Sequence, residues 1–333
     1  MRALLGLIVL AAGCTPDLGA PASLVTSTRV LAVRSTGAEN DPRRGDPVQL
    51  DALVAGPMGT TLMPPIRWDF CIAPKPLDEN NAVADACQGD DPMRLQPIPA
   101  SSPGASAPVP SNGCQLFGPV APSPEPGQPP LRPRDPDVTG GYYQPVRAIL
   151  IGGGPGGGDL YSFGLSRIRC DLANAPAADA AEYNRTYTLN INPHLASVTG
   201  KVSSASPLPL PREGMTPGGN VLGPVPAGAT ITVRADWTAE SRESYPVWET
   251  ATQSGGTGSG GKLVTHFEAL RVSWFGTGGA FAHDRSGRGE TETETFTEVE
   301  WKAPDAPGQV FVWAVLRDSR GGVDWGAFRI EIQ

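Results

Sequence analysis

Apolar and polar residues alternate over many short stretches of the chain, which is the pattern of half-buried β-strands. In 47–56, for example, Val48, Leu50, Ala52 and Val54 fall on one face. The strands predicted in this way cover 27–36, 47–56, 66–72, 144–151 and 160–169 in the first half, and 229–238, 268–276, 291–301, 309–317 and 323–332 in the second. Only 176–186 favours a helix, with Pro176 at its first position, where a missing N–H costs nothing. The pattern therefore predicts a mainly β protein with one short helix.

Proline and glycine interrupt this pattern in two long stretches. The chain has 41 Gly and 36 Pro in 333 residues, and 14 of the prolines lie in 92–136. We expect 92–136 to be polyproline-like or disordered, because proline cannot continue a helix or a sheet ladder. A second such stretch covers 206–228.

The strand series divides into two parts, with a predicted boundary near Asn192-Pro193. The fold class predicted is therefore two antiparallel β-sandwiches joined by long Pro/Gly-rich loops. We assign 24–192 to the first domain, with 92–136 as an insertion, and 193–333 to the second.

The N-terminus has the features of an export signal. Arg2 precedes a ten-residue apolar run, which is shorter than the about 20 residues of a membrane-spanning helix. Small residues then lead directly to Cys14. This segment resembles the lipobox of bacterial lipoproteins, which implies cleavage after residue 13 and acylation of Cys14. The alternative is an ordinary secretion signal. Thr15, in place of Asp, implies the outer membrane under the enterobacterial sorting rule, and 14–23 is typical of a tether.

Four further cysteines, all in the first half, are Cys71, Cys87, Cys114 and Cys170. An even number in an exported chain favours two disulfides, for which three connectivities exist. We favour Cys71–Cys87 and Cys114–Cys170. The spacings do not match zinc or redox motifs.

Two resemblances bear on the fold. The order of the first strands and the hairpin from Trp313 to Gly322 resemble immunoglobulin-like (Ig-like) and PKD-like modules of bacteria. The N-terminal third, with STRVLAVRS and the segment from Asp69 to Gln88, is similar to predicted lipoproteins of myxobacteria. These resemblances imply Ig-like β-sandwiches and no particular activity.

Candidate chemistry is sparse along the chain. The glycines of 152–158 include a G-x-G-x-x-G match, but a strand and not a helix follows, so a hairpin loop is predicted and no nucleotide site. His194, His266 and His283 are scattered and no G-x-S-x-G motif occurs, so a hydrolase is only an alternative. Residues 284–290 loosely match an acidic calcium loop, but two arginines oppose a cation there. We therefore expect no enzyme activity, no metal and no cofactor.

Acidic and aromatic residues complete the expectations. The net charge of −8 without a basic cluster argues against nucleic acid. Alternating glutamates in 290–300 predict a solvated strand face. Trp248 lies in an irregular stretch and is the candidate for an exposed, ligand-stacking ring. We expect a lipid-anchored envelope protein that binds an envelope protein or acts as a structural spacer. A carbohydrate-binding surface protein that holds envelope polysaccharide is the alternative.

Overall fold

The structure, a computed structural model, describes residues 21–333 apart from 63–64, 76–78, 80–82, 102–103, 119–122, 124–125, 128–141, 173–174, 204, 216–219 and 251–260. The predicted signal peptide and Cys14 lie outside the described residues. No helix in the described part of the chain is long and apolar enough to cross a membrane.

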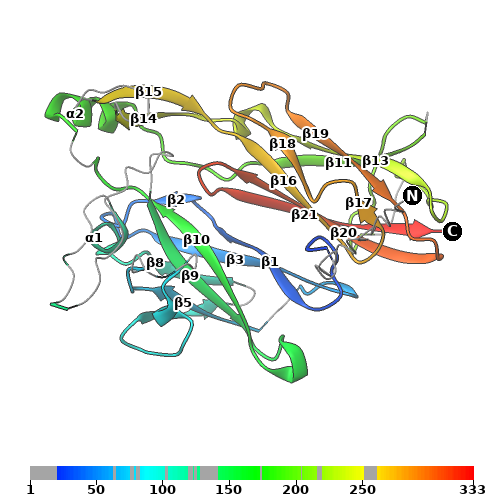
Figure 1. The fold of residues 1–333 in the computed structure, drawn as a ribbon, viewed down its shortest axis with the longest axis horizontal. Coiled ribbons are helices and arrows are strands. Elements are labelled where there is room, and N and C mark those ends of the chain that lie inside the picture. Colours follow the sequence, from blue (N-terminus) through cyan, green and yellow to red (C-terminus); the bar gives the residue numbers. More distant parts are fainter. Residues whose placement is uncertain are drawn as a thin grey trace, which may run out of the picture.

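The N-terminal sandwich is formed by two sheets (Figure 1). Sheet I contains β1 (Arg29–Ser35), β3 (Pro47–Gly56), β4 (Gly59–Thr60), β7 (Ala100–Ser101) and β8 (Gly104–Pro108). Sheet II contains, in spatial order, β2 (Glu39–Asn40), β10 (Leu160–Ile168), β9 (Tyr142–Leu150), β5 (Ile66–Cys71) and β6 (Leu95–Ile98). The predicted face of β3 and the ring of Trp68, which is 1% exposed, meet in the core between these sheets.

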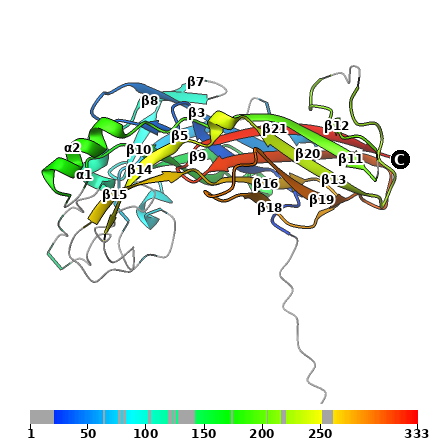
Figure 2. The same ribbon diagram turned by 90° about the horizontal axis from the view of Figure 1, so that it is seen from above.

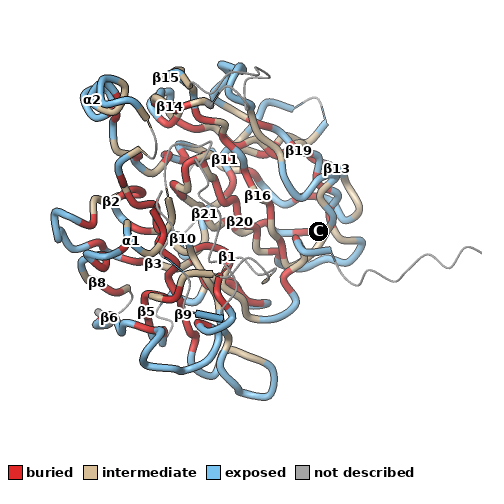
Figure 3. The backbone as a smooth tube through the Cα atoms, turned by 60° about the vertical axis from the view of Figure 1, so that its left-hand side comes forward, coloured by how far each residue is buried: buried red, intermediate tan, exposed pale blue. Residues whose placement is uncertain are grey.

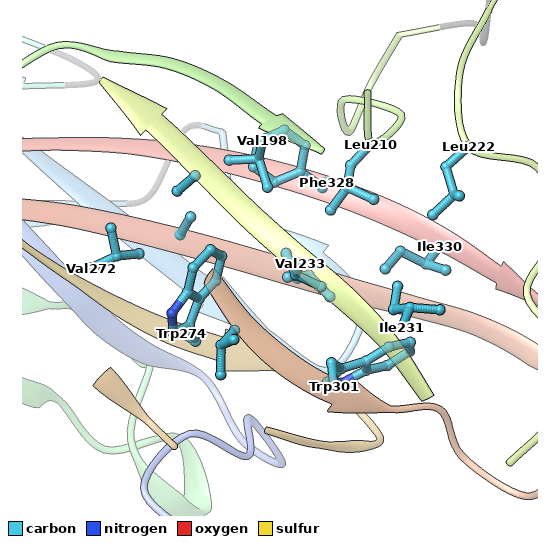
Figure 4. Close-up of a cluster of buried hydrophobic side chains, with 14 of the residues drawn as sticks. Val198, Leu210, Leu222, Ile231, Val233, Val272, Trp274, Trp301, Phe328 and Ile330 are labelled. Carbon is cyan, nitrogen blue, oxygen red and sulfur yellow. The ribbon is translucent and has the colours of Figure 1, made fainter. Parts of the chain in front are cut away.

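The C-terminal sandwich also has two sheets. Sheet III contains β18 (Arg285–Arg288), β16 (Leu270–Gly276), β20 (Gly308–Asp318) and β21 (Val323–Ile332). Sheet IV contains β12 (Leu208–Pro209), β11 (Leu195–Val202), β13 (Thr230–Trp237), β19 (Phe296–Lys302) and β17 (Ala280–Phe281). Trp274, Trp301 and Phe328 fill the core between sheets III and IV (Figure 4). The mainly β, two-sandwich fold class predicted from the sequence is confirmed.

The four sheets are stacked in the order II, I, III, IV, because sheets I and III also pack against each other. β3 and β20 are therefore buried on both faces, and buried residues run along them through the middle of the molecule (Figure 3). A strand covered on both sides needs apolar residues on both faces. This explains why 309–317 lacks the alternation of an exposed strand.

The short elements gather at one end of the long axis, and the C-terminus lies at the other (Figure 2). They are the helices α1 (Gly113–Phe117) and α2 (Ala177–Thr186) and the hairpin of β14 (Ser244–Thr250) and β15 (Gly261–Phe267). Three single-turn 3-10 helices, η1 (Asp85–Cys87), η2 (Pro155–Gly157) and η3 (Ala239–Ser241), lie in loops. α2 is the predicted helix, although Pro176 caps it and is not its first residue.

The prediction for 92–136 is wrong over part of its length. β6, β7, β8 and α1 lie in this stretch, and most of the remainder is outside the described residues. Sheet II places β6, which contains Pro97, at its edge, where a strand can lack one N–H donor. A count of prolines therefore overestimated the loss of sheet structure.

The two disulfides join Cys71 to Cys87 and Cys114 to Cys170, which is the favoured pairing. The first holds a loop over the outer face of sheet II. Arg147 lies beneath this loop, where it pairs with Asp69 at 2.8 Å and donates to the carbonyls of Cys87 and Gly89. The disulfide and the hydrogen bonds of Arg147 together hold the loop against that face.

Candidate functional site: the seam between the two sandwiches

The face-to-face contact between sheets I and III, here called the seam, is apolar at its centre. Leu31, Leu53 and Ala55 of sheet I face Trp313 and Val315 of sheet III. Each of these side chains is at least nine-tenths buried. Full burial of a large apolar side chain stabilises by about 1.5–3 kcal/mol, so the seam resembles a domain core more than a casual contact.

Hydrogen bonds hold the seam at its sides. The indole N–H of Trp313 donates to the Thr60 hydroxyl at 2.8 Å, and that hydroxyl donates to Glu213 at 2.6 Å. On another side, Arg34 pairs with Asp324 at 2.9 Å. Thr60 and Arg34 belong to sheet I, whereas their partners belong to the C-terminal part of the chain. These bonds fix the register of one sandwich on the other.

The connection between the sandwiches is itself bonded to both of them. The Asn192 side-chain amide donates to the carbonyl of Ser35 at 2.8 Å, and its oxygen accepts the N–H of Val323 at 2.9 Å. Asn190 donates its backbone N–H to Glu39 at 3.0 Å and its side-chain N–H to Asp318 at 3.2 Å. The predicted domain boundary at Asn192 is thus a fixed joint.

Charged side chains continue from this joint into both sandwiches. The ionic cluster consists of Glu39, Arg167, Glu243, Glu268, Asp318 and Arg320. On the N-terminal side, Arg167 lies 3.4 Å from Glu39, and the Tyr187 hydroxyl donates to the same carboxylate at 2.7 Å. Neither charged side chain has exposed surface.

Arg320 organises the C-terminal half of the ionic cluster. Its guanidinium donates to Glu268 at 2.7 Å, to Glu243 at 3.0 Å and to the carbonyl of Thr188 at 3.2 Å. The preceding turn folds back so that Asp318 accepts the backbone N–H of Arg320 at 2.8 Å. Because Glu243 and Glu268 flank β14 and β15, Arg320 also anchors the base of that hairpin.

The ionic cluster contains four carboxyl groups and two guanidinium groups. Burial raises the pKa of Glu268, and the nearby charge of Asp318 adds to this, so that the pKa is about 8. Burial likewise raises the pKa of Asp318 and of Glu243. A buried carboxylate without a full share of positive charge favours its neutral form.

A second charged group, His266 with Glu249 and Glu290, lies at the hairpin of β14 and β15. The Nε2 atom of His266 is 3.0 Å from Glu249 of β14, and its Nδ1 atom is 3.0 Å from Glu290. Partial burial lowers the pKa of His266, but the hydrogen bonds and charges of Glu290 and Glu249 outweigh it, and the pKa is raised. Both ring nitrogens are engaged, so neither is available as a base toward a substrate.

The other candidate residues do not converge on a site. His283 is exposed, and the His194 side chain, 69% exposed, lies 3.6 Å from Asp324. The three histidines are thus scattered. Ser241 lies beside His194 but accepts its backbone N–H, at 2.8 Å, so the described contacts contain no imidazole paired with both a serine hydroxyl and a carboxylate. Within the described residues, no three acidic, Cys or His side chains are placed to hold a metal ion.

The structure corrects the interpretation of Trp248. This residue is 8% exposed, lies in β14 and packs over Gly261 of β15. Five of the other six tryptophans are also buried, and the half-buried Trp325 is stacked under Arg34 at 4.1 Å. The carbohydrate alternative required two or three tryptophans coplanar on one exposed face, and none of the seven tryptophans, all of them among the described residues, is exposed.

Two loop interpretations have different outcomes. The glycines of 152–158 form the hairpin loop between β9 and β10, as predicted, and Gly152 and Gly156 have positive φ angles. Residues 284–290, which loosely match a calcium loop in sequence, contain the strand β18. Glu298 and Glu300 lie exposed on β19, but Glu290, Glu292 and Glu294 precede the strand and are in a loop.

The residues of the seam were not found as candidates from the sequence. The turn that contains Asp318 and Arg320 was noted only as a closing hairpin, and Asn192 only as a boundary. A weak signal exists, because the charges of Glu268 and Arg320 directly flank long apolar strands. Sequence alone does not show that these flanks meet.

Comparisons with known proteins leave the family open. No family model and no curated protein matches the chain. Among solved structures, the D0-D1 domain of Intimin is 11% identical over 91% of this chain and 98% of that chain, with a TM-score of 0.21. Latent PorU from Porphyromonas gingivalis is 10% identical over 93% of this chain and 24% of that chain, with a TM-score of 0.21. The N-terminal region of enterococcal surface protein is 9% identical over 95% and 97%, with a TM-score of 0.19. TM-scores this low carry no conclusion about fold or activity.

Proposed function

We propose that the protein is a lipid-anchored component of the cell envelope with a non-enzymatic binding role, and that the sandwiches form one rigid platform. The observation that carries the proposal is the seam. It combines an apolar centre, partly buried hydrogen bonds and a connection bonded to both sandwiches, all of which oppose relative movement of the sandwiches.

The face-to-face arrangement favours a platform over a spacer. Domains joined end to end extend their reach with each added unit, whereas sheets I and III stack and place the second sandwich beside the first. A molecule built in this way presents a broad, fixed surface. We therefore propose binding of an envelope protein in preference to the spanning of a distance.

The test of a partner is crosslinking of tagged protein in intact envelopes, followed by purification and mass spectrometry. We expect one envelope protein to be enriched reproducibly. A variant with Glu300→Arg, on the exposed outer face of sheet IV, tests whether that face takes part in binding the partner. If no protein is enriched and the chain is instead held by envelope polysaccharide and released by free sugar, the proposed role is wrong.

The anchor is proposed from the sequence of the N-terminus and has its own test. Wild-type protein should incorporate labelled palmitate and fractionate with the outer membrane. Cys14→Ala should lose the label and become soluble, because stable anchoring requires the acyl chains. Absence of label from the wild type would contradict the anchor and leave the platform untouched.

A further inference from the structure

The ionic cluster carries more negative than positive groups in a largely buried place, where Glu243 is its most exposed side chain at 15%. Glu268, Arg320 and Arg167 have at most 1% of their side chains exposed. With every carboxyl ionised, four negative charges would face two positive ones. The Coulomb energy of such an excess is large in a poorly solvated site, so retention of a proton is the favourable solution.

The groups around Glu268 come from every element packed there. From the C-terminal sandwich and its hairpin these are Glu243, Asp318, Arg320 and Tyr245, whose ring lies 4.5 Å from the Arg320 guanidinium. From the N-terminal sandwich and the connection they are Glu39, Arg167, Tyr143 and Tyr187. Among the described residues, Arg167 and Arg320 are the cations that form ion pairs inside this cluster, and each is already paired with a carboxylate.

We propose that the ionic cluster is a proton-dependent latch: the sandwiches stay docked at this end while one of its carboxyls is protonated, and the joint loosens when that proton is lost. The geometry makes this a property of the joint. Asn190 bonds both Glu39 and Asp318, so repulsion within the cluster acts directly on the residue that connects the two sandwiches.

The direction of the response follows from linkage. The pKa of Glu268 is raised by burial and by Asp318 to about 8, above its usual value of about 4.3 in an unfolded chain. The folded state therefore holds more protons than the unfolded state between these values, and folding is favoured on the acid side. Stability falls as the pH rises toward 8. The latch is closed at pH 6 and loosens at pH 9. This inference does not depend on the anchor or on a partner.

The test is hydrogen exchange of the full chain between pH 6 and pH 9, corrected for the intrinsic exchange rate. The peptides to follow cover 187–194 and 318–323. We expect their protection to fall at least several-fold across this range in the wild type. Glu268→Gln, which resembles the protonated carboxyl, should keep its protection at pH 9. Glu300→Gln, on the exposed face of sheet IV, should behave as the wild type does.

The pKa of His266 is also raised, because the hydrogen bonds and charges of Glu290 and Glu249 outweigh its partial burial, so its effect needs separation from that of the latch. His266→Gln should leave the pH dependence at 187–194 and 318–323 intact. As a second readout, the unfolding equilibrium constant of His266→Gln, which removes the contribution of the histidine, should rise by up to tenfold per pH unit approaching pH 8, as expected for one linked proton. Adding Glu268→Gln to this variant should flatten the slope. Equal protection at pH 6 and pH 9 in the wild type, or an unchanged slope on adding Glu268→Gln, would overturn the proposal.

Discussion

Asn190 has no exposed surface, and its backbone and side chain donate hydrogen bonds to carboxylates of different sandwiches. An asparagine in a connection between domains is expected to be solvated. Here the backbone N–H donates to Glu39 and the side-chain amide donates to Asp318, so the connection is ordered by the same groups that carry the charge of the joint. Asn190 matters to the joint because it lies between Glu39 and Asp318 and donates a hydrogen bond to each.

Replacement of this amide tests the joint directly. Asn190→Ala should lower the free energy of unfolding by about 1–3 kcal/mol, because Asp318 loses a partner in a buried site. Urea titration at pH 7 measures the change. Asn184→Ala, at an exposed position of α2, is the matched control and should change stability by no more than about 0.5 kcal/mol. Equal effects from the two variants would contradict a bridging role for Asn190.

His266 gives a second residue-level prediction. A neutral imidazole has one N–H, so it cannot donate to Glu249 and Glu290 at once. Because the folded pKa is raised, the stabilisation is complete below the unfolded value of about 6.5 and is lost as the pH rises through the folded pKa. NMR titration of the ring should show a pKa above 6.5.

The control for His266 is a variant that cannot titrate. Hydrogen exchange in β14 and β15, corrected for the intrinsic rate, should increase above the folded pKa of His266, and His266→Gln should reduce this dependence on pH. A ring that titrates below 6.5 would show that burial dominates.

At the level of elements, the disulfides have separate structural tasks. Cys71–Cys87 spans 16 residues and fixes a loop over sheet II, whereas Cys114–Cys170 spans 56 residues and joins α1 to the end of β10. The chain-entropy model assigns about 3 kcal/mol to the shorter loop and about 4 kcal/mol to the longer one.

Replacement of each disulfide by a pair of serines tests this order of stabilisation. The double variant Cys114→Ser with Cys170→Ser should lose more stability than Cys71→Ser with Cys87→Ser, as measured by urea unfolding under non-reducing conditions. Peptide mapping of the wild type without reductant should find no free thiol at these four positions. The reverse order of stability would show that packing around Arg147, and not loop length, decides the effect.

The sequence predicted elements well where alternation was strong and failed where local composition misled. β3, β13 and β21 follow from period two alone. β14 and β15 were missed because Pro246 interrupts one strand and both depend on each other and on the Arg320 anchor for their position. β6 was missed because its proline is acceptable only at a sheet edge, and an edge is a tertiary property.

At the level of the whole molecule, the stacking of sheet I on sheet III was beyond the reach of the sequence. Leu53 and Ala55 lie on the face of β3 opposite its core residues. This apolar second face indicates that another element covers it. Nothing in the pattern identifies that partner as β20. The candidate site has the same limitation, because Glu39, Asn190 and Arg320 come together only after both sandwiches are placed.

The stack predicts cooperative unfolding. The wild type should unfold in one calorimetric transition, since neither sandwich is complete without the seam. Leu53→Asp places a charge in the apolar centre and should destabilise by about 2–5 kcal/mol and divide the transition into two. Leu62→Asp, at a position that is 80% exposed, is the control. Two resolved transitions in the wild type would show that the sandwiches are independent.

The order of the strands along the chain also has a kinetic consequence. β20 and β21 cover Leu31, Leu53 and Ala55, yet they leave the ribosome long after sheet I does. Until they emerge, the early strands present an uncovered apolar face. Such a chain depends on a holding chaperone or on rapid synthesis, and a truncation that removes β20 and β21 would produce an aggregating species rather than a shortened but functional one.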